Sequence, residues 1–328
     1  MMNSDGSDTR RVVVLGTGGT IAGRAASAGD NIGYTAGEVN VADLLSGIGA
    51  PAGVTLVAEQ VAQLDSKDMS FEVWRQLARR CVHWSNVPDV VGIVITHGTD
   101  TLEETAFFLH STLSVQTPVV LTCAMRPASA LAPDGPQNVR DAIAVAATAD
   151  ARGVTVVCAG TVHSAVDVQK VHTYRLNAFA SGDAGPIGYV EEGAVRRVRQ
   201  WPGTSTDALA EVALLGSDWP RVEIITSHAG ATGAVIDALV AHGAIDAAGP
   251  LRGIVLAATG NGTLHRTIDA AAARAHATGI EIRRATRCVD GRILPRSDDK
   301  WPDAGGLSPV KARIALMLDL MRARQPGS

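Results

Sequence analysis

Two threonines that follow very apolar runs carry the residue types that could do chemistry in this chain. Glycine separates Thr20 from the run 11–16 and Thr99 from the run 90–96. Val, Ile and Leu without alternation predict strands buried on both faces, as in parallel sheets. Ligands of such sheets bind at the carboxyl ends of the strands, where glycine lets backbone approach them closely. Because a hydroxyl can act as a nucleophile, the pattern indicates a hydroxyl-based active site.

The composition excludes several classes of protein. The 328 residues are 46% hydrophobic and 19% charged, with a formal net charge of −4. Without a basic excess, we expect neither nucleic acid nor an anionic membrane surface as a partner. The polar start of the chain is unlike a signal peptide, and no apolar run reaches the roughly 18 residues of a membrane span. We therefore expect a cytoplasmic protein, with its four scattered cysteines reduced.

Strand-like and helix-like patterns alternate along the first part of the chain, which is typical of βαβ units. This predicts a larger N-terminal domain, residues 1–199, with a mostly parallel sheet. The expected strands are 11–16, 53–60, 90–96, 118–123 and 153–158, and the expected helices are 70–82, 101–114 and 136–149.

A second α/β domain is expected after a linker. Residues 200–220 contain Trp-Pro pairs, Gly, Ser and Thr, a composition typical of a linker. The alternation then restarts and predicts a smaller, flavodoxin-like α/β domain over 221–328. Its expected strands are 221–227, 252–258 and 279–285, and its expected helices are 232–242, 263–277 and one that Ser308 caps and Pro309 begins.

The loop that carries Thr20 has two other interpretations. Gly18 and Gly19 could simply turn a strand into a helix, with Thr20 as the N-cap. The loop also approximates the G-x-G-x-x-G/A pattern of dinucleotide-binding proteins. That pattern requires an acidic residue at the end of a second strand, yet Asp30 and Asp43 do not follow an apolar run.

Asp100 and Lys170 could serve the Thr99 hydroxyl. A lysine stabilises a neighbouring carboxylate or, when desolvated, acts as a base. The alternative for Asp100 is a structural role as a helix cap. Residues 101–104 directly after it also have the spacing of a capping box.

Together the two loops closely resemble the bacterial-type L-asparaginase family. The resemblance rests on residues 17–23 (Thr-Gly-Gly-Thr-Ile-Ala-Gly) and 95–105 (Ile-Thr-His-Gly-Thr-Asp-Thr-Leu-Glu-Glu-Thr). Further motifs follow in the family's order and extend the resemblance over nearly the whole chain: residues 34–37, 65–69, 124–127, 134–136, 185–189, 260–262 and 308–313.

The resemblance implies hydrolysis of L-asparagine to L-aspartate and ammonia without metal or cofactor. It implies that Thr20 is the nucleophile, activated by Tyr34, and that Thr99, Asp100 and Lys170 form a second triad. The implied substrate-binding residues are Ser66, Lys67, Asp100, Gly19, Gly98 and Ala124. Ser66 would hold the α-carboxylate, Asp100 the α-ammonium, and the Ala124 carbonyl would lie beside the scissile amide. The resemblance also implies a homotetramer, a dimer of dimers, with sites between subunits.

Residues 22–37 are predicted to form a mobile lid. The segment holds four glycines and several small residues, a composition suited to a loop that orders when substrate binds. Closure would exclude water and strengthen hydrogen bonds to an oxyanion.

Three features depart from the family pattern. Lys67 stands where many periplasmic-type members carry glutamine, and Thr263 where several carry asparagine or serine. Segment 288–304 is shorter than in family members that have long signal peptides. The acidic residue that a neighbouring subunit contributes in the family could therefore be Asp290, Asp298 or Asp299.

The histidines do not indicate a metal site, because pairs such as His163 and His172, or His228 and His242, lack ligand spacing. His97 is expected to make structural hydrogen bonds. Other functions that remain open are a glutaminase-asparaginase, the amide-hydrolysing subunit of a transamidosome, and an asparagine- or aspartate-binding regulatory protein.

Overall fold

The structure, a computed structural model, describes residues 10–203, 218–242 and 249–324. The chain divides into two compact units, Met1–Leu215 and Gly216–Ser328. Residues 204–217 of the predicted linker lie outside the described residues, so the linker and the domain limits around it stay predictions.

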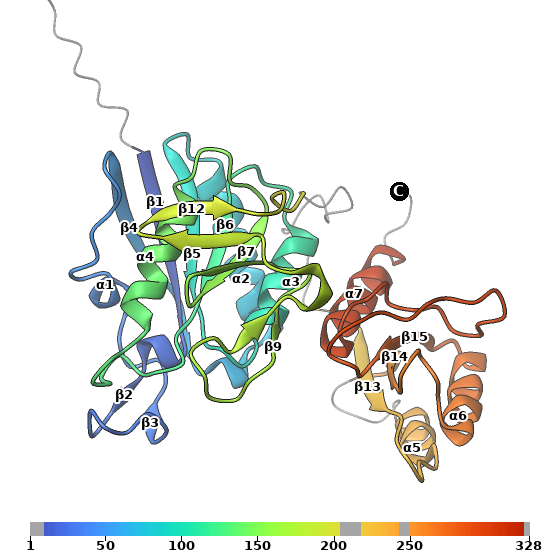
Figure 1. The fold of residues 1–328 in the computed structure, drawn as a ribbon. Coiled ribbons are helices and arrows are strands. Elements are labelled where there is room, and N and C mark those ends of the chain that lie inside the picture. The colour runs from blue at the N-terminus through green and yellow to red at the C-terminus, as the bar shows by residue number, and fades with distance from the viewer. Residues whose placement is uncertain (1–9, 204–217, 243–248, 325–328) are drawn as a thin grey trace, which may run out of the picture. The chain divides into compact units, whose positions relative to one another are not determined.

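An eight-stranded sheet forms the centre of the first unit (Figure 1). Its order is β12-β11-β8-β7-β6-β5-β1-β4. The neighbours from β4 to β7 pair in parallel, whereas β8, β11 and β12 pair antiparallel at one edge. The mostly parallel sheet is thereby confirmed. The strands are β1 (Arg10–Gly18), β4 (Val54–Leu64), β5 (Val90–Thr96), β6 (Val119–Thr122), β7 (Val154–Cys158), β8 (Thr161–Ser164), β11 (Gly188–Glu191) and β12 (Ala194–Arg197).

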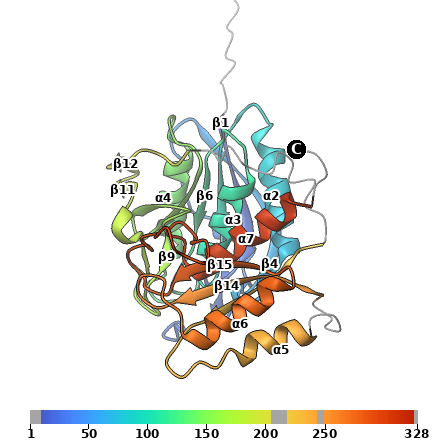
Figure 2. The same ribbon diagram turned by 90° about the vertical axis from the view of Figure 1, so that its right-hand side faces the viewer.

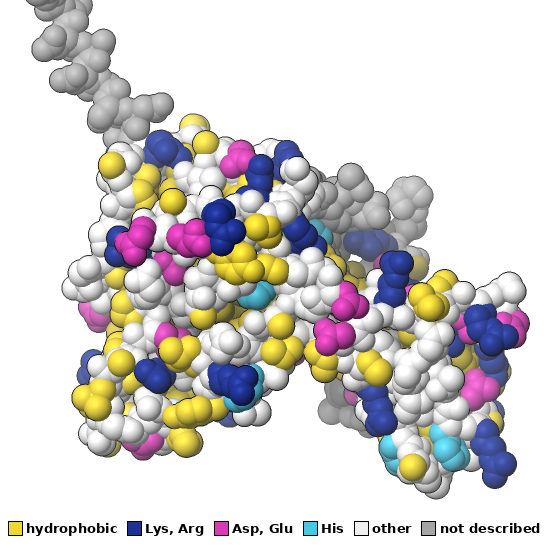
Figure 3. Space-filling model, viewed as in Figure 1, with side chains coloured by type: hydrophobic (Ala, Val, Ile, Leu, Met, Phe, Trp, Pro, Cys, Tyr) yellow, Lys and Arg dark blue, Asp and Glu magenta, His cyan; other side chains and the backbone are white. Residues whose placement is uncertain are grey.

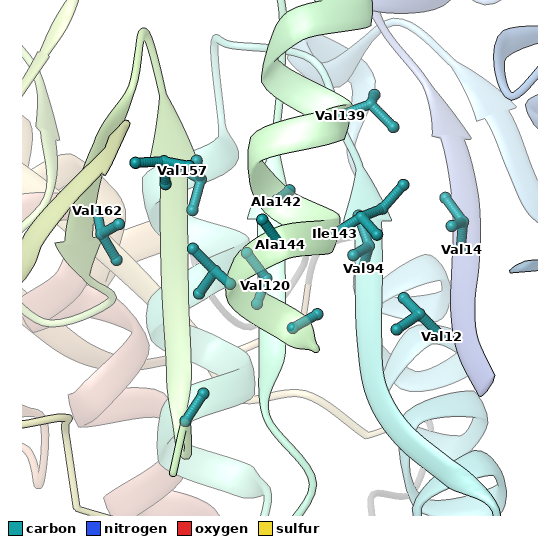
Figure 4. Close-up of a cluster of buried hydrophobic side chains, with 14 of the residues drawn as sticks. Val12, Val14, Val94, Val120, Val139, Ala142, Ile143, Ala144, Val157 and Val162 are labelled. Atoms are coloured by element: carbon teal, nitrogen blue, oxygen red, sulfur yellow. The ribbon is translucent and has the colours of Figure 1, made fainter. Parts of the chain in front are cut away.

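Helices cover both faces of this sheet. Val139, Ala142 and Ile143 of helix α4 pack with Val12 and Val94 of the strands (Figure 4). In Figure 2 the sheet stands between α4 and α2. The runs without alternation are therefore buried on both sides, as expected for a parallel sheet. The helices are α1 (Val41–Leu44), α2 (Phe71–Ser85), α3 (Leu102–Thr112) and α4 (Gly135–Ala146), with short 3-10 turns η1 (Thr20–Ala22), η2 (Ser66–Asp68) and η3 (Gly182–Ala184).

Two small hairpins lie outside the main sheet. Strands β2 (Arg24–Ala25) and β3 (Tyr34–Thr35) pair antiparallel, as do β9 (Gln169–Lys170) and β10 (Phe179–Ala180). Their positions could not be read from periodicity because each strand has only two residues. They matter here because they carry Tyr34 and Lys170.

The second unit is a separate parallel α/β sheet, so the predicted fold class is confirmed. Its order is β13-β14-β15. Helices α5 and α6 pack together on one face, and Leu316 of α7 packs near Gly253 on the other (Figure 1). Helix α7 begins at Pro309 directly after Ser308, as predicted. The elements are β13 (Arg221–Thr226), α5 (Ala234–His242), β14 (Leu251–Ala258), α6 (Arg266–Ala277), β15 (Glu281–Thr286) and α7 (Pro309–Arg322).

Charged side chains of both signs are interspersed over the face drawn in Figure 3, with no single basic area on it. In the part of the chain that the structure describes, no helix is long and apolar enough to cross a membrane.

Candidate active site

The two threonine loops leave the sheet at the same edge. Strands β1 and β5 are parallel neighbours, with Gly16 opposite Thr96 at their carboxyl ends. The Thr17 hydroxyl donates to the Thr96 carbonyl at 2.9 Å and ties the ends together. Parallel pairing therefore places both loops where ligands of such sheets bind.

Glycine allows the two loops to touch. A Cβ on Gly19 would lie 2.3 Å from both N and Cα of Gly98. Gly19 also has φ +79°, a left-handed conformation that favours glycine. Thr20 and Thr99 each follow one of these glycines, so the backbone contact brings the two hydroxyl-bearing residues to one place.

The Thr20 side chain is paired with Tyr34. The two hydroxyl oxygens lie 2.6 Å apart, and Thr20 is 7% exposed. Gly19 takes the N-cap position of η1, so Thr20 is not the helix cap. The Gly37 N–H donates to the Gly19 carbonyl at 3.2 Å, which joins the end of the predicted lid to the start of the Thr20 loop. The mobility of that lid stays a prediction.

Lys170 joins the second group. Its Nζ donates to Thr99 Oγ1 at 2.8 Å and to Asp100 Oδ1 at 2.6 Å. The Lys170 side chain is mostly buried and Asp100 is half exposed. Hairpin β9–β10 holds the lysine in place, and its backbone N–H donates to Glu103 at 3.4 Å. The ion pair and the hydroxyl thus form one connected group from loops distant in sequence.

The capping-box spacing correctly predicts the start of the helix, but the Thr101 side chain does not make the capping bond. Helix α3 has Thr101 at its N-cap, with no hydrogen bond from its side chain to the helix. Thr101 Oγ1 donates instead to the Ser66 carbonyl at 2.7 Å, and Asp100 bonds Lys170. The polar side chains at this helix start are used across the site.

Ser66 belongs to the same cluster. It is buried, and its Oγ accepts from the Asp100 N–H at 3.1 Å. Lys67 next to it is 62% exposed at the side chain, and its ammonium contacts Asp65 at 2.6 Å and Asp68 at 3.5 Å. The hydrogen bond to Asp65 raises the pKa of Lys67.

A buried histidine supports the Thr99 loop. His97 Nδ1 lies 2.7 Å from the Gly98 carbonyl, and its Nε2 lies 2.9 Å from Thr105 Oγ1, which accepts from Trp74 at 2.8 Å. Burial lowers the pKa of His97 to about 4. The ring is therefore neutral at pH 7, donating to Gly98 through Nδ1 and accepting at Nε2. This agrees with the expected structural role.

Ala124 lies buried just after β6. A Cβ on Gly135 would lie 3.0 Å from Ile21 Cγ1 and 3.5 Å from the Ala124 Cβ. Gly135 therefore lies between Ala124 and the residue that follows Thr20. Hydrogen bonds with Asp134 and Asn138 hold the residues on either side of Ala124. Spacing in the sequence did not indicate these roles, although residues 134–136 form one of the motifs that carry the resemblance.

The remaining predicted residues lie in the second unit. Thr263 Oγ1 and Thr259 Oγ1 are 2.8 Å apart. Asp298 pairs with Arg296 at 3.0 Å and Asp299 with Arg284 at 2.7 Å. The part that these residues, or Asp290, play in a site between subunits stays a prediction.

Metal-ligating groups do not gather in the described residues: no three His, Cys, Asp or Glu side chains among them could hold a metal ion together. All four cysteines are free, and the thiols of Cys123 and Cys158 face each other at 2.8 Å.

Two family models together match nearly the whole chain. Residues 11–202 match "Asparaginase, N-terminal" and residues 221–327 match "Glutaminase/Asparaginase C-terminal domain". L-asparaginase 2 of Escherichia coli (strain K12) is 36% identical over 96% of this chain and 90% of its own length. Glutaminase-asparaginase of Pseudomonas fluorescens biotype A is also 36% identical, over 95% and 87%.

A solved structure has the same fold. The crystal structure of a probable cytoplasmic L-asparaginase from Campylobacter jejuni matches with a TM-score of 0.87 and 35% identity. The match covers 97% of each chain.

Proposed function

We propose that this chain, which belongs to the bacterial-type asparaginase family, hydrolyses the side-chain amide of L-asparagine to L-aspartate and ammonia. The observation that carries the proposal is the meeting of two hydrogen-bonded threonine hydroxyls at one sheet edge. Thr20 is hydrogen-bonded to Tyr34, Thr99 is hydrogen-bonded to Lys170, and the glycines before the two threonines are in contact. A protein that only bound asparagine would not need both.

In the first step the Thr20 oxygen attacks the amide carbon. Its proton passes to the Tyr34 oxygen 2.6 Å away as the Tyr34 hydroxyl releases its own proton toward the amide nitrogen, and the carbonyl oxygen becomes an oxyanion that backbone N–H groups of the glycine loops stabilise. With this proton on the leaving nitrogen, the C–N bond breaks and ammonia departs. An aspartyl ester on Thr20 remains.

In the second step water hydrolyses that ester. The Lys170 ammonium donates to both Thr99 and Asp100, so it orients the Thr99 hydroxyl. Thr99 thereby directs the attacking water. Addition of water releases L-aspartate and restores the Thr20 hydroxyl, so no atom is left on the protein.

The substrate's charged groups select their partners by chemistry. The half-exposed Asp100 carboxylate suits the α-ammonium, and Ser66 with adjacent N–H groups suits the α-carboxylate. The Lys170 bond orients Asp100. Gly19 and Gly98 let the backbone approach the substrate, and the Ala124 carbonyl receives the leaving nitrogen.

A mixed asparaginase and glutaminase activity is the second candidate. A relative at 36% identity is named glutaminase-asparaginase, and the two amides differ by one methylene. A pocket discriminates such substrates by only about 1–3 kcal/mol.

We also propose a cytoplasmic homotetramer built as a dimer of dimers, in which an isolated subunit is inactive. The similarity to a protein described as a probable cytoplasmic L-asparaginase supports the location. Sedimentation combined with activity tests the assembly, because an active monomer would contradict it.

The experiment that tests the function is ammonia release from L-asparagine and, separately, from L-glutamine. We expect release from asparagine by the wild-type protein and its loss in Thr20→Ala and Thr99→Ala. If neither amide is hydrolysed while asparagine still binds, the binding-protein alternative replaces this proposal.

A further inference from the structure

Asp134 holds the backbone on one side of Ala124. Its two carboxylate oxygens accept from the N–H groups of Met125 and Arg126, each at 2.9 Å. Two successive amides bound by one carboxylate fix both the position and the orientation of that stretch of backbone, and bonds to a charged acceptor are the stronger kind.

Asn138 holds the backbone on the other side. Its Nδ2 donates to the Cys123 carbonyl at 2.9 Å and to Asp134 at 3.3 Å, while its Oδ1 accepts from the Ala159 N–H at 3.0 Å. Asn138 is 3% exposed. One buried amide therefore joins the end of β6, the loop after β7 and the carboxylate of Asp134.

These bonds end on the neighbours of Ala124 and use no atom of Ala124 itself. Both residues lie at the start of α4, where Asp134 takes the N-cap position but its carboxylate accepts no hydrogen bond from the backbone N–H groups of the helix. A carboxylate at an N-cap usually accepts from the first turn. Here it turns to the loop instead, which a purely helix-capping role does not explain.

The held loop continues onto the predicted lid. The Ala128 N–H donates to the Gly23 carbonyl at 2.9 Å, and the Ala25 N–H donates to Ser129 Oγ at 2.8 Å. The segment that begins at Ala124 therefore contacts the strand next to Tyr34. A shift of this loop would therefore move both the Ala124 carbonyl and Tyr34 relative to Thr20.

We propose that Asp134 and Asn138 are positioning residues for amide hydrolysis, which hold the Ala124 carbonyl where the leaving nitrogen departs. The inference rests on the proposed function. The leaving nitrogen gains its proton on the way to the transition state and not in the bound substrate. Loss of this positioning therefore lowers kcat more than it changes KM.

The first test compares Asp134→Ala with Gln137→Ala. Gln137 lies on the same helix, but its amide donates to Asp141 and not to the loop. We expect about a 10²-fold lower kcat for Asp134→Ala, with KM within a few-fold and an unchanged kcat for Gln137→Ala. Asp134→Asn, which keeps one acceptor oxygen, is expected in between and serves as the test if the alanine variant does not fold.

Hydrogen exchange supplies a readout apart from activity. The amides of Met125 and Arg126 are expected to exchange at least tenfold faster in Asp134→Ala than in wild type. An active wild type whose Asp134 variants keep full kcat, or unchanged exchange at these amides, would overturn the inference. A wild type that releases no ammonia would instead overturn the proposed function.

Discussion

Gly19 and Gly98 are in direct backbone contact, although 78 residues of chain lie between them. A Cβ on Gly19 would lie 2.3 Å from the Gly98 nitrogen, much closer than real Cβ atoms approach other atoms. The contact is possible only because neither residue has a side chain, and it sets the separation of the Thr20 and Thr99 loops.

Gly19→Ala is therefore expected to push the loops apart. We expect a loss of about 10²-fold in kcat and a destabilisation of about 2–4 kcal/mol from strain and overpacking. Gly47→Ala is the matched control, because Gly47 has φ +83° but an added Cβ would meet nothing within 4 Å. Gly47→Ala should be destabilised only by the backbone strain and should keep full activity. Equal activity losses in both variants would contradict the importance of the contact.

Tyr34→Phe removes the hydroxyl that lies 2.6 Å from Thr20. We expect kcat for asparagine to fall about 10²–10⁴-fold, the range for loss of a proton-transferring group, with thermal stability nearly unchanged. Tyr189→Phe is the control. The Tyr189 ring lies on β11 under Arg196, so loss of its hydroxyl should leave kcat unchanged. Steady-state rates of ammonia release decide, and a fully active Tyr34→Phe would remove this tyrosine from the mechanism.

His97 predicts a pH dependence of stability. Its pKa falls from 6.5 to about 4 on folding, so the unfolded state binds more protons between these values. The free energy of unfolding therefore decreases as pH is lowered from 6.5 to 4, by roughly 3 kcal/mol from this group. Urea unfolding of wild type and His97→Gln at both pH values measures it.

The His97→Gln variant should lose less stability over that window than wild type does. The exposed His228→Gln should behave as wild type. A His97→Gln protein with the same pH dependence as wild type would show that His97 does not titrate as its burial requires.

Lys67→Gln is expected to shift substrate preference and hardly to affect stability. The ammonium pairs with Asp65 and Asp68 at an exposed position, where ion pairs contribute little. We expect activity on glutamine relative to asparagine to rise up to about tenfold, the scale on which one methylene is discriminated. The ratio of kcat/KM values for the two amides measures it. Asp68→Asn, which removes only the longer contact, should leave the ratio unchanged.

The parts of the fold that follow from local pattern could be predicted. Val12, Ile93 and their neighbours are apolar because both faces of their strands are covered, and that signal is visible in the sequence. The antiparallel edge β8, β11 and β12 was missed because its strands have four residues each, too few for periodicity to show.

Only part of the candidate site could be predicted from local sequence pattern. The threonine loops could be found because they end apolar strands. Chemistry made Lys170 a candidate, but its assignment to the Thr99 group needed the family resemblance, since nothing local distinguishes a lysine that reaches a residue 71 positions away. Asp134 was noted only within the family motif 134–136, because a side chain that turns from its own helix to another loop leaves no mark in spacing.

Acylation of the Thr20 oxygen is tested most directly by rapid acid quench followed by peptide mass spectrometry. Lys170→Met is the protein to use, because loss of the group that serves the water step should let the ester accumulate. After mixing with L-asparagine, we predict an aspartyl adduct on the peptide containing Thr20, absent in Thr20→Ala combined with Lys170→Met. An adduct on Thr99 instead would contradict the account and exchange the roles of the two threonines.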